Sequence, residues 1–109
     1  MKKNCPDEIR STVLTVLKLN CGNPVERDSL SALVGVSDRM CRKAIEELRR
    51  EGEPIGQGPN GGYSYGDPVD VERTIKDYYA RAYTNLEIAR ALQRKPIDGQ
   101  VTIEDLMEF

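Results

Sequence analysis

The chain has 109 residues, of which 39% are hydrophobic, and this length suffices for one small domain with an appendage but not for two cores. Its formal net charge of −2 argues against a protein that coats nucleic acid indiscriminately, because such binding requires a large excess of cations. The charge is uneven: residues 1–66 hold 10 Lys and Arg against 9 Asp and Glu, net +1, whereas residues 67–109 hold 6 against 9, net −3. A nucleic acid would therefore bind the first part.

The first predicted element is a helix over residues 6–19. Pro6 suits the first position of a helix, and the two acids that follow it suit the positive end of the helix dipole. The apolar residues of this segment mark its buried face and are Ile9, Val13, Val16 and Leu17. The turn-forming residues 21–24 end the helix, and Val25 is predicted to be extended.

Residues 25–52 are predicted to form a short helix, a turn of about three residues and a longer second helix. The apolar stripe of the short helix consists of Leu30, Leu33 and Val34. Gly35 follows, where a helix needs a residue that tolerates positive φ, and Ser37 supplies an N-cap oxygen for the second helix.

The second helix has an apolar face and a charged face on opposite sides. Its apolar residues recur at i, i+3, i+4 and i+7 and are Cys41, Ala44, Ile45 and Leu48. Arg39, Lys43, Glu46 and Arg50 point the opposite way, and Gly52 ends the helix. A short helix, a turn with glycine and a second helix with basic residues toward its N-terminus form the arrangement that places the second helix in a DNA major groove.

Two short strands are predicted next, at Pro54-Ile55 and at residues 63–65, and the turn-rich run GQGPNGG joins them as a wing. Here the sequence resembles the winged helix-turn-helix domains of bacterial and phage regulators, the type found at the N-terminus of biotin repressors and sugar-operon repressors. The resemblance covers roughly residues 6–66 and rests on SLSALVGVSDRMCRKAIEELRREGEPI followed by NGGYSY. The positions that carry it are Gly35, Ser37, Ile45, Leu48, Gly52, Pro54-Ile55 and Gly61-Gly62-Tyr63.

The resemblance implies a mainly α (α+β) fold, with a winged helix-turn-helix domain over residues 1–66 and a two-stranded wing. The residues expected in its core are Ile9, Val13, Leu17, Leu30, Leu33, Ile45, Leu48 and Ile55. Cys41 lies on the same face and is most simply a small buried hydrophobe. A compact protein of this sort also resembles small phage or prophage-encoded DNA-binding proteins.

The predicted wing contains a motif of another fold, since Gly56, Gly58 and Gly61 spell GxGxxG, the fingerprint of dinucleotide-binding proteins. That motif must lead from a strand into a helix, but Pro59 lies inside it and the strand-like GYSY follows. We therefore interpret the glycines as a hairpin loop and expect no nucleotide cofactor.

A long helix is predicted over residues 70–95, with Asp70 as its N-cap, and it begins the second part of the chain, residues 67–109. Its apolar stripe consists of Val71, Ile75, Tyr78, Tyr79, Ala82, Tyr83, Leu86, Ala89 and Leu92. About 24 residues between the cap and Lys95 make a helix about 36 Å long at 1.5 Å per residue. This exceeds what a three-helix core covers, so we expect the helix to mediate a homodimer. The alternative is that it folds back across its own domain. The acidic tail is predicted to turn at Asp98-Gly99 and to form a short helix capped by Thr102, which could dock on another protein.

These patterns predict duplex DNA binding by a small, dimeric, cytoplasmic transcriptional regulator. The predicted DNA-contacting residues are Arg39, Met40 and Lys43 at the bases and Ser37 and Arg42 at phosphate or sugar. Two features oppose this hypothesis, since the outward Glu46 would repel phosphate and residues 52–72 contain no Lys or Arg.

A second hypothesis is a winged-helix interaction or assembly module whose long helix and acidic tail bind protein, without intrinsic DNA binding. The weak charge and the neutral wing favour it, whereas the exposed pair Arg39 and Lys43 disfavours it. On this hypothesis the two cations belong to an ordinary solvated face.

The hypothesis of an enzymatic function has little support, because the chain has no histidine to act as a base and no visible carboxylate pair or nucleophile elbow. The chain has three cysteines without CxxC spacing and no histidine, which argues against a zinc site. The residues after Lys2 and Lys3 include no apolar run, and no 18-residue apolar stretch exists. We therefore expect no signal peptide, no membrane span, no cofactor and no small-molecule ligand.

Overall fold

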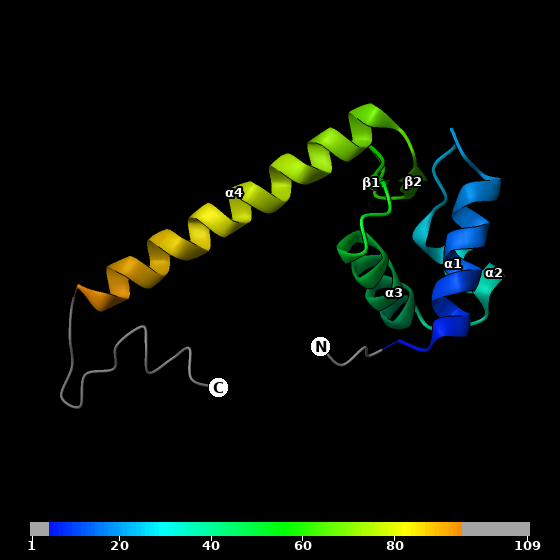
Figure 1. Ribbon diagram of the computed structural model, residues 1–109, viewed down its shortest axis with the longest axis horizontal. Helices are drawn as coiled ribbons and strands as arrows, with labels where there is room; N and C mark the ends of the chain where they lie inside the picture. The colour runs from blue at the N-terminus through cyan, green and yellow to red at the C-terminus, as the bar shows by residue number, and fades with distance from the viewer. Residues whose placement is uncertain (1–4, 95–109) are drawn as a thin grey trace. The chain divides into compact units, whose positions relative to one another are not determined.

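The computed structural model describes residues 5–94, so the features predicted for the tail, at Asp98-Gly99 and Thr102, lie outside the described residues. The elements are α1 (Asp7–Leu19), α2 (Arg27–Val34), α3 (Asp38–Arg50), β1 (Ile55–Gln57), β2 (Tyr63–Tyr65) and α4 (Pro68–Gln93), as labelled in Figure 1. This order confirms the mainly helical α+β class, the hairpin and the long helix. The chain divides into two compact units between Ile75 and Lys76, within α4.

The turn between α2 and α3 has the predicted local chemistry. Gly35 adopts a φ of 81°, in the left-handed region, and its N–H donates to the carbonyl of Ser31 at 2.8 Å. Ser37 Oγ accepts the N–H of Met40 at 3.1 Å and so caps α3. At α1, Pro6 is the residue before the helix rather than its first residue.

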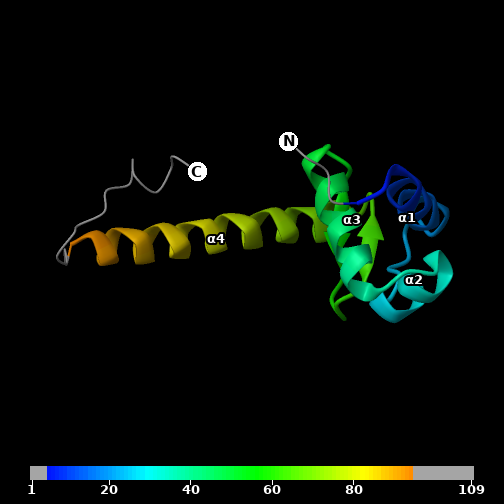
Figure 2. The same ribbon diagram turned by 90° about the horizontal axis from the view of Figure 1, so that it is seen from below.

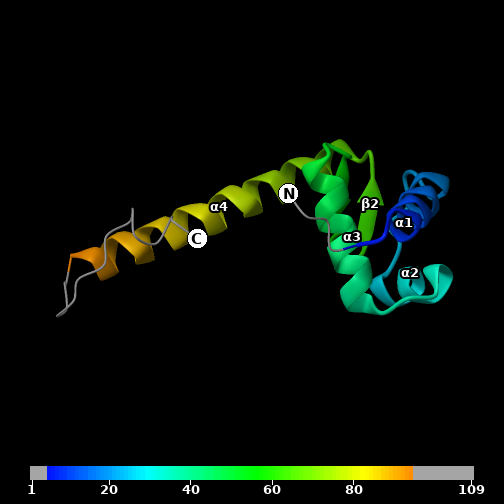
Figure 3. The same cartoon turned by 60° about the horizontal axis from the view of Figure 1, so that its bottom comes forward.

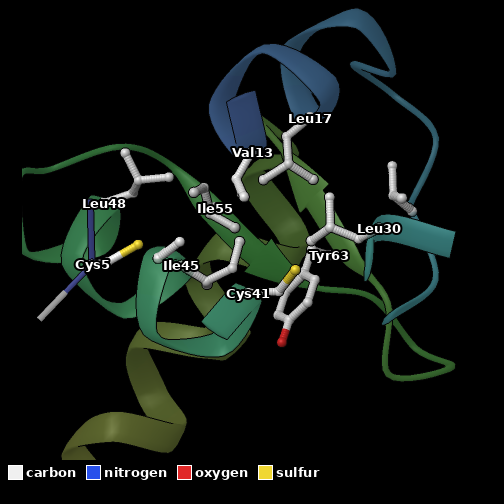
Figure 4. Packing of buried hydrophobic residues seen from close by; sticks show 11 residues of the cluster. Cys5, Val13, Leu17, Leu30, Cys41, Ile45, Leu48, Ile55 and Tyr63 are labelled. Atoms are coloured by element: carbon white, nitrogen blue, oxygen red, sulfur yellow. The ribbon is translucent and has the colours of Figure 1, made fainter. Parts of the chain in front are cut away.

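The core lies where α1, α2, α3 and the hairpin meet (Figure 4). Its buried apolar residues are Cys5, Val13, Leu17, Val25, Leu30, Cys41, Ala44, Ile45, Leu48, Ile55 and Tyr63. Figures 2 and 3 show α1 beside α3, and the two helices are in contact. This arrangement buries the apolar face of α3 that the sequence pattern predicts, and it leaves Ile9 and Val16 half-buried at the margin.

Leu33 is the core residue that was predicted wrongly, because its side chain is 64% exposed. At 3.6 residues per turn, Val34 lies one turn beyond Leu30 and packs against the core, whereas Leu33 is rotated by about 60° to the other side. The helix is eight residues long and ends at Val34. A helix this short buries a narrow stripe, and Leu33 lies outside it.

The hairpin is antiparallel, and β2 has the predicted bounds, whereas β1 covers Ile55–Gln57 and not Pro54-Ile55 as predicted. Its register pairs Ile55 with Tyr65, Gly56 with Ser64 and Gln57 with Tyr63. Val25 extends the pairing on the other side of β2. Its N–H donates to the carbonyl of Tyr63 at 2.7 Å, and its carbonyl accepts the N–H of Tyr63 at 2.9 Å. Residues 58–62 therefore form a loop between two strands and not a strand-to-helix turn, while Gly56 and Gln57, which were predicted to lie in the loop, belong to β1.

The first turn of α4 differs from the prediction, because Asp67 and not Asp70 is its cap. Asp67 Oδ1 accepts two backbone N–H groups of the turn, at 2.9 and 3.1 Å. Pro68 occupies the first helical position, which needs no donor, so α4 begins two residues earlier than predicted. Asp70 is instead buried within the turn and accepts the hydroxyl of Ser64 at 2.8 Å.

The start of α4 packs directly against β1. A Cβ on Gly56 would lie 2.6 Å from the carbonyl carbon of Asp70, so only glycine allows this approach. The N–H of Gln57 donates to Thr74 Oγ1 at 2.9 Å. The strand and the first two turns of the helix are thereby fixed to each other within the first unit.

Candidate nucleic-acid interface

The outward face of α3 carries half of its charged side chains. The helix holds five Lys and Arg against three Asp and Glu, net +2, and its buried side faces the core. Its exposed side chains include Arg39, Arg42, Glu46 and Arg50. Lys43, which was predicted to point outward, is half-buried on one flank of this face.

Two of the outward cations are paired with carboxylates. Arg42 Nε lies 3.2 Å from Asp38 Oδ2, and Arg50 Nη2 lies 2.7 Å from Glu46 Oε1. By contrast, Arg39 and Lys43 form no ion pair within residues 5–94. These two cations are therefore the ones that α3 offers to an anionic partner without first breaking a contact.

The N-terminal end of α3 is held by a cation that sequence reasoning did not single out. Arg27 Nη2 lies 2.7 Å from Asp38 Oδ2, and Arg27 Nε donates to Oδ1 at 3.2 Å. The hydrogen bond from Arg27 is the main reason that the pKa of Asp38 is lowered below its ordinary value. The two residues are eleven positions apart and belong to different helices, so no local spacing marks the pair.

The other predicted contact residues have structural roles as well. Met40 is half-buried and packs against the core, so it contributes a limited surface. Ser37 Oγ is already the acceptor of the α3 cap, which leaves its hydroxyl proton to donate to a phosphate oxygen. Their predicted contacts with DNA stay predictions.

Arg49 fixes the hairpin to α3. Its Nε donates to the carbonyl of Ile55 at 2.7 Å, and its guanidinium carbon lies 6.0 Å from the centre of the Tyr63 ring. Burial raises the pKa of the Tyr63 hydroxyl. Arg49 is therefore a structural cation, although it is one of the five that give α3 its positive charge.

A second structural cation joins α1 to α3. Arg10 is buried, and its Nη1 lies 2.6 Å from Glu51 Oε2, with Asp7 as a further partner. Its Nε lies 4.0 Å from Glu47 Oε1. The carboxylates of Glu47 and Glu51 are one helical turn apart on the flank that faces α1, where they offset the buried guanidinium.

The groove between α2, α3 and the hairpin loop is mainly acidic. Its lining residues are Glu26, Arg27, Asp28, Asp38, Asn60, Gly61 and Gly62. Three carboxylates against one guanidinium oppose the approach of phosphate, and the neighbouring hairpin contains no Lys or Arg. An anion would therefore meet α3 on its outward face and not in this groove.

The apolar stripe predicted on the long helix is exposed. Ile75 is 49% exposed, and Tyr78 and Leu86 are each 44% exposed. The remaining stripe residues after Ile75 are also exposed and are Tyr79, Ala82, Tyr83, Ala89 and Leu92. Eight apolar side chains on one helix are more than scattered surface residues account for.

Two of the three cysteines are buried, and burial is the main cause that raises the pKa of the Cys5 and Cys41 thiols. Residues 5–94 contain no cluster of three or more potential metal ligands. No helix in this part of the chain is long and apolar enough to cross a membrane.

Comparisons with protein-family models, with curated proteins and with solved structures gave no match.

Proposed function

We propose that this protein binds duplex DNA through α3 and acts as a small dimeric transcriptional regulator. On this proposal residues 1–66 form a winged helix-turn-helix domain, with α3 as the recognition helix and the hairpin as the wing. The observation that carries it is that Arg39 and Lys43, one turn apart in the N-terminal half of α3, have no ion-pair partner within residues 5–94.

The position of these cations fits base and phosphate readout. The N-terminal half of a recognition helix enters the major groove, and an arginine there reads guanine through two parallel hydrogen bonds. Arg39 is the second residue of α3, and its side chain is exposed. Lys43 is one turn further along, where a point charge suits a phosphate or a base edge.

The outward Glu46 opposes phosphate less strongly than the sequence indicates. Its carboxylate pairs with Arg50 at 2.7 Å, so the last two turns of α3 present a neutralised pair and not an isolated negative charge. The neutral hairpin offers Gln57 and Asn60 for hydrogen bonds only. Affinity would therefore depend on α3, and one domain alone would bind weakly.

Pairing through α4 would compensate for this weakness. Two recognition helices related by a two-fold axis read half-sites about 34 Å or a multiple apart, and the second contact becomes intramolecular. The exposed stripe of α4, which includes Ile75, Tyr78 and Leu86, supplies the apolar surface that a dimer would bury.

The test is selection from a random-sequence duplex library, followed by binding measurements over a range of salt concentrations. We expect enrichment of an inverted repeat and an affinity that falls steeply as salt rises. If no sequence is enriched and duplex DNA shows no mobility shift at 50 mM salt, the proposal is overturned.

The competing candidate is a protein interaction module. The acidic groove lined by Glu26, Asp28 and Asp38 favours it, because three carboxylates suit a basic protein segment better than DNA. A protein that fails the library selection but binds a basic peptide in this groove, with loss on replacement of Asp28 by Asn, would support this candidate.

A further inference from the structure

Five residues at the centre of the apolar stripe of α4 are placed symmetrically about Ala82. Ala82 lies at the centre, with Ile75 seven residues before it and Ala89 seven residues after it. Tyr78 and Leu86 lie four residues before and after the same point. Reversal of the helix about Ala82 therefore sets Ile75 against Ala89 and Tyr78 against Leu86.

The charges beside this stripe follow the same reversal. At 100° per residue, the charged side chains on one flank lie about 60° to 120° from Ile75 and are Glu72, Lys76, Glu87, Arg90 and Arg94. Along the helix their signs read negative, positive, negative, positive, positive. Reversal about Ala82 brings Lys76 level with position 88, one residue from Glu87 and two from Arg90, and brings Glu72 between Arg90 and Arg94.

We propose that two copies of α4 pair antiparallel, with the two-fold axis at Ala82 and with Lys76 of each copy against the partner's Glu87. This inference rests on the self-association in the proposed function and adds its direction. In an antiparallel pair, each flank of one helix faces the same flank of the other helix. The charged flank therefore meets its own sequence of charges in reverse order, and the reversed order complements it.

A parallel pair would lose both forms of complementarity. It would place Ala82 on Ala82 and Ala89 on Ala89, while Tyr78 met Tyr78, so gaps and crowded layers would alternate along the seam. It would also set the charged flank against the opposite flank, whose charged residue beside the stripe is Arg81. The apolar stripe alone does not choose a direction, whereas the charges and side-chain volumes do.

A distance between spin labels decides the direction. The label is placed at Gln93→Cys in a Cys21→Ser background, because Cys21 is the exposed native thiol and the other two are buried. In the antiparallel pair the two labelled positions are separated by 22 residues along the helix, about 33 Å, whereas in a parallel pair they are about 10 Å apart. The full chain is used, with its mass measured in the same sample.

A distance near 33 Å supports the inference. A distance near 10 Å overturns it but leaves a dimer that can still bind DNA, so the proposed function survives. A monomeric mass with no dipolar coupling overturns the inference together with the dimeric part of the proposed function, and DNA binding is then judged by the library selection alone.

Charge reversal tests the named ion pair. Glu87→Lys opposes Lys76 in two symmetric places and should raise the dimer dissociation constant about tenfold. Adding Lys76→Glu to the same chain should restore the constant to within about twofold, with helix content checked by circular dichroism. Asp77→Lys, on the opposite side of α4, is the matched control and should leave the constant unchanged. A double variant as weak as Glu87→Lys alone would overturn the pairing.

Discussion

Arg27 and Asp38, the first residues of α2 and α3, are joined by an ion pair in which Arg27 Nη2 lies 2.7 Å from Asp38 Oδ2. The contact ties together the starts of the two helices on either side of the Gly35 turn. It also places a carboxylate beside the proposed DNA-binding cations, because the same oxygen lies 3.2 Å from Arg42 Nε. The ion pair therefore stabilises the fold, whereas the carboxylate of Asp38 repels the phosphates of the proposed DNA ligand.

The lowered pKa of Asp38, which is due mainly to the hydrogen bond from Arg27, predicts how stability depends on pH. A carboxyl whose pKa is lower in the folded chain contributes stability above its unfolded pKa, and the contribution disappears as the pH falls through the folded pKa. Asp38→Asn should therefore lower the urea midpoint at pH 7, and the difference from wild type should shrink below about pH 4. Urea titrations of both proteins at pH 7 and pH 2 check this. An equal difference at both pH values would rule out the ionised pair as its source.

Replacement of Arg39 and Lys43 together by Ala should weaken DNA binding strongly. Both side chains lie off the buried face of α3, so the fold should be retained, and each lost phosphate contact should lower the slope of log K against log salt by about 0.9. Fluorescence anisotropy over a salt series measures the affinity and the slope. Lys18→Ala, which removes an exposed cation of α1, is the control. Unchanged affinity in the double variant would remove the site and favour the interaction module.

Ile45→Ala should destabilise the first unit by roughly 2 to 5 kcal/mol, because the side chain is 2% exposed and its truncation leaves a cavity in the core. Leu33→Ala, on the neighbouring helix, should change the free energy of unfolding by less than about 0.5 kcal/mol, since Leu33 is 64% exposed. Urea unfolding of the two variants compares a buried and an exposed apolar residue of the same size. Equal costs would contradict the core as described.

Aspartate at Ile75 and at Leu86 together should give a monomer whose first unit stays folded but whose DNA binding is much weaker. Two charges in the apolar stripe oppose its burial between two copies of α4. A monomer also loses the second DNA contact, which is intramolecular in the dimer. Sedimentation at tens of micromolar and DNA titration measure the two effects. Ile88→Asp, a similarly exposed apolar residue of α4 outside the stripe, is the control and should leave both unchanged. A wild-type chain that sediments as a monomer would contradict the proposal.

Features that depend on local chemistry could be predicted from the order of the residues. The apolar spacing of α3 predicted the buried Ile45, and Gly35 and Ser37 predicted the left-handed turn and the cap. The hairpin was predictable because its strands flank a run of glycines, asparagine and proline. Each of these signals acts within a few residues, where backbone preferences and a single side-chain hydrogen bond decide the conformation.

The contacts between side chains of different elements could not be predicted in this way. The local pattern predicted Asp70 as a helix cap, but the hairpin packs against the start of α4 and buries Asp70 against Ser64 of β2, and Asp67 is the cap. Likewise, no spacing in the chain pairs Arg27 with Asp38. The physical reason is that such contacts depend on how helices and strands pack around a shared core, and the energy of that packing depends on residues far apart in the sequence.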